Sequence, residues 1–341
     1  MIKNNWSILT LTNLKFQMSG RFGEFTKEVE TMLQIIRPAI DISLVGQEKL
    51  KNSEVQIKAD HSPVSICDFA CQTIIVKGIK ENFPTDKVLG EEDVNHEDES
   101  FLRLVQTLLP DGLDPLLTCK DVISHISEDM HRVWVIDPID GTYAFIKNGN
   151  YAIATALLID LEVVCSIVAW PRHKPEITNI PLDGPLIFVS AKGHGSYAVD
   201  LDGNYYQLKK NGHPQNRMIA SINLSERERK TIDFIEERLG IKEEFNDSSM
   251  TKGFVLAAGA GSVYPRIRCL ADEHVWDIAP FDLFVREAGG FSTTIDGKPL
   301  KYSKEGKTID SKRGLFFTFD DETFHQKVLE LYREAYDRFY K

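Results

Sequence analysis

The sequence lacks the features that mark several large classes of protein. Its 341 residues include only five cysteines, an odd number without CxxC spacing, so a disulfide-stapled module is excluded and reduced thiols in a cytoplasmic compartment are expected. It has no run of about 18 consecutive apolar residues, which a membrane-spanning helix needs, so we expect no membrane partner. Internal repeats and low-complexity tracts are also lacking, which excludes solenoids and disordered linkers as its main architecture.

Basic charge is also scarce relative to acidic charge. The chain has 40 lysines and arginines against 51 aspartates and glutamates, a formal net charge of -11. Proteins that bind nucleic-acid polymers usually carry a basic face, so DNA and RNA are not expected as partners. Small anions are still possible ligands at places where the local charge of the protein is positive. Hydrophobic residues make up 42% of the chain, enough for one large domain or two packed lobes.

The first residues are expected to lie outside the fold. Residues 1–17 are too short and too polar a stretch for a signal peptide or a membrane span, and Met18 is an alternative start. We expect a leader at 1–17, an N-terminal α+β lobe with the metal motifs at 18–200, and a C-terminal α/β lobe at 201–341. The oligomeric state stays open.

Apolar periodicity predicts the main elements. Residues 25–50 repeat apolar side chains at spacings of three and four, which predicts one or two helices interrupted near Pro38. Residues 151–171 predict two antiparallel strands with a turn at Asp160. Strands and helices alternate without a strict βα repeat, and this order favours stacked α and β layers over a barrel.

Two other features have ordinary structural interpretations. Cys67 and Cys71 have helical i,i+4 spacing, and we interpret them as core thiols in preference to a metal pair. The polar stretch Asp93 to Asp98 is interpreted as a solvated loop.

Two aspartates follow an apolar run in VWVIDPIDGTYAF, residues 133–145. Proline cannot continue a strand ladder, so the strand is expected to end at Asp137, break at Pro138 and turn at Asp140. These two carboxylates and the carbonyl of Ile139 are expected to converge on one point. Mg²⁺ prefers such oxygens, although an Asp-Pro turn with a helix cap needs no ligand and stays open from this stretch alone.

The glycine and the hydroxyl of this motif are candidate substrate-binding residues. Gly141 and Thr142 would open the next helical turn and offer their backbone N–H groups to an anion.

Two further acid clusters follow predicted elements. KVLGEED places Glu91 and Glu92 after a short buried strand. HVWDIAPFDLFVREAGG places Asp277 at the start of an amphipathic helix, where a carboxylate caps the helix or binds a metal. Acid clusters at three element ends indicate a multi-metal phosphate site.

These motifs resemble a known family. GEE, WVIDPIDGT and WDIAPFDLFVREAGG are similar, in this order, to the signature segments of the inositol monophosphatase superfamily of Mg²⁺-dependent, lithium-sensitive phosphatases. The resemblance extends from about Phe22 to near the C-terminus. Within the superfamily, SPVSICDFACQTIIVKGIKENFPTDKVLGEED is most similar to the 3'(2'),5'-bisphosphate nucleotidases.

The resemblance implies both a fold and an activity. The implied fold is α+β, a layered αβαβα sandwich with the metals at the junction of two lobes. The implied reaction is hydrolysis of the 3'(2')-phosphate of adenosine 3',5'-bisphosphate, or of its 5'-phosphosulfate relative, by metal-activated water.

The same resemblance implies a set of ligands for two or three Mg²⁺ ions. Glu91, Asp137 and the carbonyl of Ile139 are the implied ligands of one ion. Asp137, Asp140 and Asp277 are the implied ligands of a second, so that Asp137 bridges the two.

Catalytic residues are implied in the same way. Asp68 with Thr142 would orient and deprotonate the attacking water, at a third metal reached through Glu91. The alternative for Asp68 is an N-cap of the helix at Phe69. Glu92 is a weaker candidate, for which a surface position is the alternative.

Substrate contacts are implied in the second half of the chain. Ser249, Lys252 and Arg266 match positions near the second phosphate and the base of the nucleotidases, with ordinary surface charge as the alternative. Asn223, in ASINLSERE, stands where fungal and plant relatives have a Gly-His-Ser-Ser stretch, which weakens the case for adenine.

Two other functions compete with a nucleotidase acting on a small phosphorylated molecule. One is an inositol (poly)phosphate phosphatase that uses the same site. The other is a non-catalytic sensor of metal or phosphate, against which the complete set of acidic and hydroxyl residues argues.

Overall fold

The computed structural model describes most of the chain. Described are residues 20–50, 54–58, 62–92, 99–127, 129–209, 214–267, 273–302, 306–309, 311 and 313–341. The expected leader at 1–17, the alternative start at Met18, the expected loop from Asp93 to Asp98 and Cys269 lie outside these residues.

Helices and short strands alternate along the described chain. The helices are η1 (Gly23–Phe25), α1 (Thr26–Lys49), α2 (Ile66–Asn82), α3 (Glu99–Gln106), α4 (Pro115–Cys119), α5 (Thr142–Ile146), α6 (Pro175–Thr178), α7 (Glu226–Leu239), α8 (Thr251–Ala257), α9 (Val275–Glu287) and α10 (Glu322–Phe339). The strands of the first half are β1 (Val55–Ile57), β2 (Pro63–Ser65), β3 (Lys87–Gly90), β4 (Val122–Ile123), β5 (Arg132–Asp140), β6 (Ala152–Ile159), β7 (Glu162–Trp170), β8 (Leu186–Ala191), β9 (Gly195–Val199) and β10 (Tyr205–Leu208). Those of the second half are β11 (Arg217–Ser221), β12 (Glu243–Asp247), β13 (Val263–Arg266), β14 (Glu273–His274), β15 (Phe291–Thr294), β16 (Thr308–Ile309) and β17 (Leu315–Thr318).

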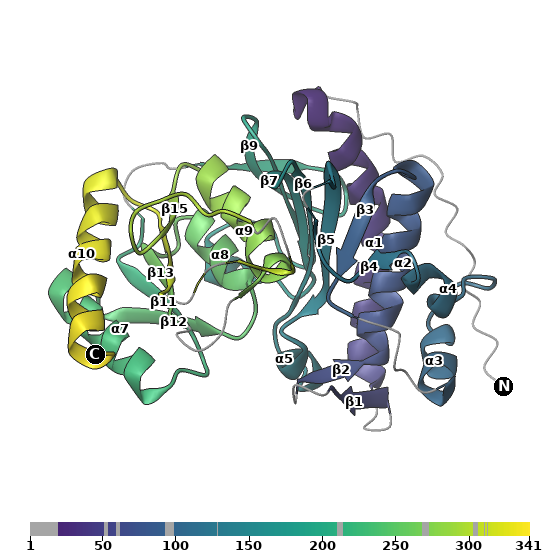
Figure 1. Ribbon diagram of the computed structural model, residues 1–341, viewed down its shortest axis with the longest axis horizontal. Helices are drawn as coiled ribbons and strands as arrows, with labels where there is room; N and C mark the ends of the chain where they lie inside the picture. The colour runs from purple at the N-terminus through teal and green to yellow at the C-terminus, as the bar shows by residue number, and fades with distance from the viewer. Residues whose placement is uncertain are drawn as a thin grey trace.

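These elements stack in five layers (Figure 1). Helices α1 and α2 cover one face of an eight-stranded sheet, and α8 and α9 separate it from a five-stranded sheet that α7 and α10 cover on the outside. Apolar clusters fill the space under α1 and α2, around α8 and α9, and under α7 and α10. The expected α+β fold, an αβαβα sandwich, is thereby confirmed.

The large sheet has a parallel and an antiparallel part. Its order is β10-β9-β8-β7-β6-β5-β3-β4, and β3 is parallel to both β4 and β5. The predicted hairpin is confirmed as β6 and β7, with Asp160 and Leu161 at φ 50° and 66° in the turn. Positive φ at both residues gives a turn whose twist matches the flanking strands. Strand β10 belongs to this sheet, a few residues beyond the predicted lobe boundary at residue 200.

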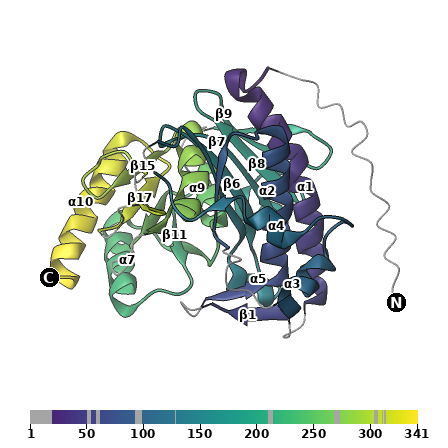
Figure 2. The same cartoon turned by 45° about the vertical axis from the view of Figure 1, so that its right-hand side comes forward.

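Helix α1 runs through Pro38 without interruption, so the predicted break there is wrong. A proline removes the N–H that would bond to the carbonyl four residues earlier, here that of Gln34. Because Gln34 is exposed, water can bond to this carbonyl in place of the missing N–H. The buried face on both sides of Pro38 packs against α2 and the sheet, which holds the helix together. Figure 2 shows α1 and α2 side by side on the outer face of the sheet.

Two of the predicted core thiols are confirmed. Cys67 and Cys71 lie in α2, are buried and form no disulfide. Burial raises the pKa of Cys67 to about 12 and that of Cys71 well above its usual value. Both thiols therefore stay protonated and act as small apolar groups.

The small sheet brings three strand ends to one edge. Its order is β12-β11-β13-β17-β15, and β11 is parallel to both β12 and β13. The carboxyl ends of β11, β12 and β13 therefore lie at the same edge. Crevices outside the carboxyl ends of parallel strands are common ligand-binding positions in sheets of this kind.

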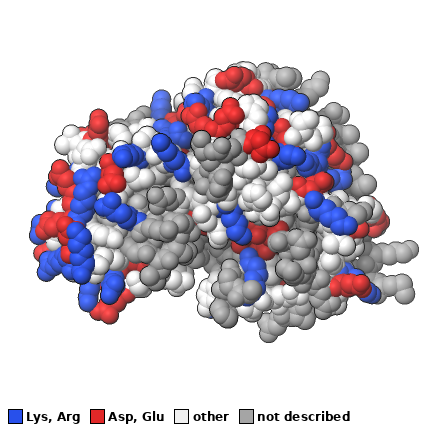
Figure 3. Space-filling view, viewed as in Figure 1, with Lys and Arg blue, Asp and Glu red and all other residues white. Residues whose placement is uncertain are grey.

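The surface carries mixed charge. Basic and acidic side chains are interspersed over the face in Figure 3, including the end of the molecule that α7 and α10 cover. Among the described helices, none combines the length and the apolar character that crossing a membrane requires.

Candidate active site

The first acidic residues meet at the carboxyl ends of parallel strands. Glu91 directly follows β3, and Asp137 lies near the end of β5. Gly90 is paired with Ile136, and the N–H of Glu91 donates to the carbonyl of Ile136 at 3.1 Å. Two acid clusters that are 46 positions apart in the sequence thus lie at one edge of the large sheet.

Strand β5 was predicted to end at Asp137. This prediction is wrong, because the strand continues to Asp140 through a bulge. Asp137 is opposite Ala154 and Asp140 is opposite Ala152, so β5 contains one more residue than β6 between these pairs. Side chains alternate along a strand, and residues three apart normally point to opposite faces. The extra residue in the bulge lets both carboxylates reach the same side, and Pro138 lies where the ladder is interrupted.

A third carboxylate joins these two from the central helix layer. Asp277 is the third residue of α9, which begins after His274. One oxygen each from Asp137, Asp140 and Asp277 lies within 4.8 Å of the others. Strand β5 and helix α9 thereby meet in one acidic cluster, at the junction of the large sheet and the central helices.

The three-carboxylate cluster fits a hard divalent cation. The Oδ1 atom of Asp137 is buried and has no hydrogen-bond partner among the described residues. Burial, and then the charges of Glu91 and Asp140, raise the pKa of Asp137 well above its usual value. Burial and the charge of Asp277 raise the pKa of Asp140 to about 7. A cation would remove this repulsion and coordinate the unpaired oxygen.

Asp68 and Thr142, predicted to act together, are in contact. The hydroxyl of Thr142 lies 3.3 Å from Oδ1 of Asp68 and 3.0 Å from the carbonyl of Ile139. Both side chains are buried. Asp68 is also the third residue of α2, and its Oδ2 accepts hydrogen bonds from the N–H and hydroxyl of Ser65 at 2.8 and 2.6 Å. The N-cap is therefore Ser65, and Asp68 completes a capping box.

Burial shifts the titration of this carboxyl. It raises the pKa of Asp68 to about 7, although the hydrogen bonds from Ser65 act in the opposite direction. A carboxyl group that titrates near neutral pH suits general acid–base chemistry.

Glu91 and Glu92 share a partner that was not predicted. The ammonium of Lys58, in the connection that follows β1, lies 2.9 Å from Glu91 and 3.0 Å from Glu92. Burial lowers the pKa of Lys58, but the charges of the two glutamates outweigh this effect and raise it. Glu91, a predicted metal ligand, thus lies beside the three-carboxylate cluster without being part of it.

Glu92 is buried, so the alternative of a surface position is wrong. Its backbone N–H and carbonyl are both bonded to the side chain of Gln72 in α2, at 3.1 and 2.7 Å. Gln72 and Lys58 together fix the end of β3 on which Glu91 lies. The sequence signal for both partners was weak, because neither lies in an acidic motif.

The loop between β12 and α8 touches the turn after β5. Gly141 has a φ of 92°, and a Cβ atom there would lie 3.0 Å from the Cβ of Ser249. Both the left-handed conformation and this close approach require glycine. The N–H of Met250 in the same loop donates a hydrogen bond to Oδ2 of Asp140. Ser249 and Gly141, both predicted substrate residues, are therefore neighbours.

Lys252 is not a surface charge, so that alternative is wrong. Its side chain is buried, and its ammonium donates to the carbonyls of Asp247, at 2.9 Å, and Ser249. Its positive charge lowers the pKa of Asp140, which shows that it acts on the carboxylate cluster.

Arg266 lies at the carboxyl end of β13 and is also mostly buried. Its guanidinium binds both carboxylate oxygens of Glu273, at 3.2 and 2.6 Å, and its side chain is 13% exposed. Its charge also acts on Asp140, so Lys252 and Arg266 both face the acidic cluster. The surface alternative is wrong here too, although the guanidinium is already paired.

Asn223 lies on the same edge but is exposed. It follows β11 by two residues, and the N–H of its neighbour Ile222 donates to the carbonyl of Asp247 at 3.3 Å. Asn223 and Ser249 thus follow the carboxyl ends of β11 and β12, and Arg266 lies at the carboxyl end of β13, in three neighbouring parallel strands.

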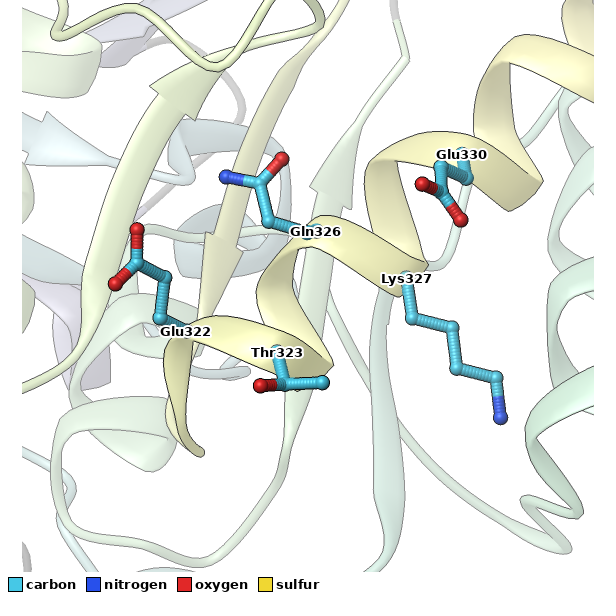
Figure 4. A pocket seen from close by; sticks show the side chains of 5 residues that line it. All are labelled: Glu322, Thr323, Gln326, Lys327 and Glu330. Atoms are coloured by element: carbon cyan, nitrogen blue, oxygen red, sulfur yellow. The ribbon is translucent and has the colours of Figure 1, made fainter.

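A hollow on the surface of α10 is a different kind of feature. Its lining residues are Glu322, Thr323, Gln326, Lys327 and Glu330, which all project from one helix (Figure 4). Helix α10 forms the outer end of the second lobe, away from the three-carboxylate cluster (Figure 1). One helix surface of mixed charge offers no convergent groups for catalysis, so the hollow is not the candidate site.

Comparisons with known proteins agree with this geometry. The chain is 29% identical to 3'(2'),5'-bisphosphate nucleotidase 1 of Candida albicans, over 86% of this chain and 92% of the relative. It is 30% identical to 3'(2'),5'-bisphosphate nucleotidase of Oryza sativa, over 86% and 90%.

Solved structures share the fold. The IMPase of Thermotoga maritima has a TM-score of 0.60 and 19% identity, covering 92% of this chain and 99% of that one. CysQ of Bacteroides thetaiotaomicron, a bacterial member of the inositol monophosphatase family, has a TM-score of 0.57 and 21% identity, covering 91% and 100%. The model of the inositol monophosphatase family matches residues 24–334, and the chain therefore belongs to this family.

Proposed function

We propose that the protein is a Mg²⁺-dependent phosphomonoesterase that removes the 3'(2')-phosphate of a nucleoside bisphosphate such as adenosine 3',5'-bisphosphate. The observation that carries the proposal is the division of charge across the junction. Carboxylates from β5 and α9 form a metal-type cluster, and two largely buried cations, Lys252 and Arg266, face it from the second lobe. A substrate with two phosphates at different positions matches one acidic and one basic half of a site.

The acidic half is proposed to hold two or three Mg²⁺ ions. Glu91, Asp137 and the carbonyl of Ile139 would hold one ion, and Asp137, Asp140 and Asp277 a second. The unpaired, buried Oδ1 of Asp137 supports the shared role of this residue. When bound, the ions neutralise phosphate charge and lower the pKa of a water molecule.

Asp68 and Thr142 are proposed to handle the proton of the attacking water. Their 3.3 Å contact supports a pair in which the Thr142 hydroxyl passes a proton to Oδ1 of Asp68. A hydroxyl by itself is too weak a base, so it needs the carboxylate. The raised pKa of Asp68, about 7, suits proton acceptance near neutral pH.

The basic half is proposed to bind the phosphate that is not hydrolysed. Lys252 supplies a point charge and Arg266 a planar fork, while Ser249 and the backbone of Gly141 and Thr142 line the space between the halves. The curated relatives above, named as bisphosphate nucleotidases, support this substrate class. Asn223 is exposed at the same edge, where it would contact the base.

A substrate panel tests the proposal. Phosphate release is measured for adenosine 3',5'-bisphosphate, a 3'-monophosphate and inositol phosphates, with Mg²⁺ and with EDTA. We expect Mg²⁺-dependent release with the nucleoside bisphosphate preferred, and almost none from Asp137→Asn. Preference for inositol phosphates would instead assign an inositol phosphate phosphatase to the same site, and no release from any ester would leave a sensor of metal or phosphate.

A further inference from the structure

Asp247, the last residue of β12, collects hydrogen bonds from two lobes. Its Oδ1 accepts from the backbone N–H groups of Ser248 and Ser249, at 2.6 and 3.1 Å. Its Oδ2 accepts from the hydroxyl of Thr251 at 3.1 Å and from Nδ2 of Asn150 at 2.9 Å. Ser248 and Ser249 belong to the loop that follows β12, and Thr251 begins α8, whereas Asn150 belongs to the first lobe.

The backbone around Asn150 adjoins the acidic half of the site. Asn150 precedes β6, and its carbonyl lies 3.5 Å from where a Cβ of Gly141 would be. The Cβ of Ser249 lies 3.0 Å from the same position. The turn after β5 thus adjoins both Asn150 and the loop that Asp247 organises.

The loop has a second attachment to the first lobe, the hydrogen bond from the N–H of Met250 to Oδ2 of Asp140. Its position sets that of Lys252 as well, because the Lys252 ammonium donates to the carbonyls of Asp247 and Ser249. The Asn150–Asp247 contact and the Met250–Asp140 contact therefore fix the buried cation relative to the carboxylate cluster.

We propose that Asn150 and Asp247 form a latch between the lobes that positions the loop 248–250 and the start of α8, and with them Lys252, for the phosphate that is not hydrolysed. Both are positioning residues. The role of the latch in binding the phosphate that is not hydrolysed rests on the function proposed above. The contact between the lobes does not rest on it.

A local role of Asp247 is distinguishable from this one. Its bonds to the N–H groups of Ser248 and Ser249 form a turn within the second lobe and need no partner elsewhere. If Asp247 only stabilised this turn, the side chain of Asn150 would have no influence on the loop. Asn150 is therefore the residue on which the inference depends.

Exchanging the two side chains gives a sharp test. Asn150→Asp opposes two carboxylates and Asp247→Asn opposes two amides, whereas the double variant restores an amide facing a carboxylate. Asn150→Ala is a milder variant that removes the donor without adding repulsion. The pair Asn204 and Asp200, with the same 2.9 Å amide–carboxylate contact in an exposed turn, provides the matched control variant Asn204→Asp.

The first measurement needs no substrate. Hydrogen exchange of the Met250 amide is followed in each variant, with near-native circular dichroism as the criterion of folding. Each single latch variant should exchange about 10-fold faster or more, because loop opening becomes easier, while the exchanged pair and Asn204→Asp stay near the wild type. Unchanged exchange in Asn150→Ala and Asn150→Asp would overturn the latch.

The second measurement compares kcat/KM for adenosine 3',5'-bisphosphate and for a 3'-monophosphate. In the single variants, kcat/KM for the bisphosphate divided by kcat/KM for the monophosphate should fall about 10-fold, mainly because KM for the bisphosphate rises. The exchanged pair should recover the wild-type quotient. If the quotient of the two kcat/KM values stays constant while hydrogen exchange of the Met250 amide accelerates, the role of the latch in binding the second phosphate is overturned. A wild type without preference for bisphosphates would overturn the proposed function alone, and exchange of the Met250 amide would still decide the latch.

Discussion

Asp68 uses its two carboxylate oxygens for two different tasks. Oδ2 accepts the hydrogen bonds of Ser65 and caps α2, while Oδ1 faces the hydroxyl of Thr142. The N-cap of α2 is Ser65, whereas the alternative interpretation expected Asp68, and Asp68 keeps its Oδ1 for the proposed role as catalytic base. The cap fixes the orientation of the carboxylate, and this orientation aims the remaining oxygen at Thr142.

Replacing Thr142 with valine should lower kcat by about 10² to 10⁴, the usual contribution of a positioned proton transfer. Valine keeps the β-branched shape and removes only the hydroxyl, which lies 3.0 Å from the Ile139 carbonyl and 3.3 Å from Asp68. Initial rates at saturating Mg²⁺ measure the change. Thr73→Val is the matched control, because its buried hydroxyl donates within α2 to the carbonyl of Phe69. A normal kcat in Thr142→Val would reduce Thr142 to a structural residue.

Some site residues were predictable from the sequence and others were not. Asp137, Asp140 and Asp277 stand in ordered motifs, and the structure brings these three together. Lys58 and Asp247 have no such signal, because a lysine in a polar stretch or an aspartate beside serines usually faces solvent. Only the approach of separate segments shows that Asp247 is buried and Lys58 partly buried beside the site.

At the scale of elements, α5 depends on a helix from another part of the chain. It spans only five residues, too few for a helix that is stable alone, and it carries Thr142. Gln47 in α1 donates both amide hydrogens, to the carbonyls of Phe145 and Gly149, each at 3.0 Å. Its own oxygen accepts from the guanidinium of Arg172 at 2.6 Å.

We expect Gln47→Leu to lower the free energy of unfolding by about 2–4 kcal/mol, because two carbonyls and one guanidinium N–H lose their partner. Turnover should also fall, since α5 loses its attachment. Urea denaturation measures the stability. Gln34→Leu, an exposed glutamine in the same helix, should change it by no more than about 0.5 kcal/mol. Equal stabilities of the two variants would mean that α5 does not need α1.

Two predicted element boundaries were wrong, and both lie at prolines. The local rule predicts a break where proline removes a donor. At Pro38 the freed carbonyl belongs to the exposed Gln34, and helix packing maintains α1. At Pro138 the strand continues through a bulge, and that bulge lets two carboxylates reach the same side. Periodicity predicted the layers well, but tertiary packing decides what happens at a single proline.

At the scale of the whole molecule, stability depends on histidines that fold in the neutral form. His325 of α10 is buried against the small sheet, with its ring nitrogens 2.8 Å from the hydroxyls of Thr293 and Thr318. Burial lowers the pKa of His325 to about 4, against 6.5 for an ordinary histidine. The unfolded chain therefore binds more protons between these two pH values.

The contribution of His325 to the free energy of unfolding should consequently fall as the pH drops from about 6.5 to about 4, and stay level above that window. For His325 the loss amounts to at most about 3 kcal/mol. The measurement is the difference in the free energy of unfolding between the wild type and His325→Gln across this pH range. The subtraction cancels the contributions of carboxyl groups that titrate in the same window. A difference that is independent of pH would contradict a buried neutral imidazole.

The two lobes are proposed to divide the substrate between them, and this division can be tested by removing one charge. Lys252→Met keeps a long apolar stem in the buried site and removes the ammonium. A charge-assisted hydrogen bond contributes about 1.5–3 kcal/mol, so KM for a 3',5'-bisphosphate should rise about 10-fold to 100-fold. Hydrolysis of a 3'-monophosphate should change far less, because the reacting phosphate is proposed to bind to the metals that the carboxylate cluster holds.

Arg266 needs a gentler change, since its removal would leave the buried Glu273 without a partner. Arg266→Lys keeps the charge but loses the planar fork, so it should raise KM for the bisphosphate while leaving the protein folded. Steady-state kinetics on both substrates separates binding from general damage, because a misfolded variant loses both activities together.

If Lys252→Met weakened mono- and bisphosphate turnover equally, Lys252 would serve the reacting phosphate. Of the two proposed cations, Arg266 alone would then be left for the second phosphate, and because Arg266 is already paired with Glu273, a substrate with a single phosphate would fit the site better.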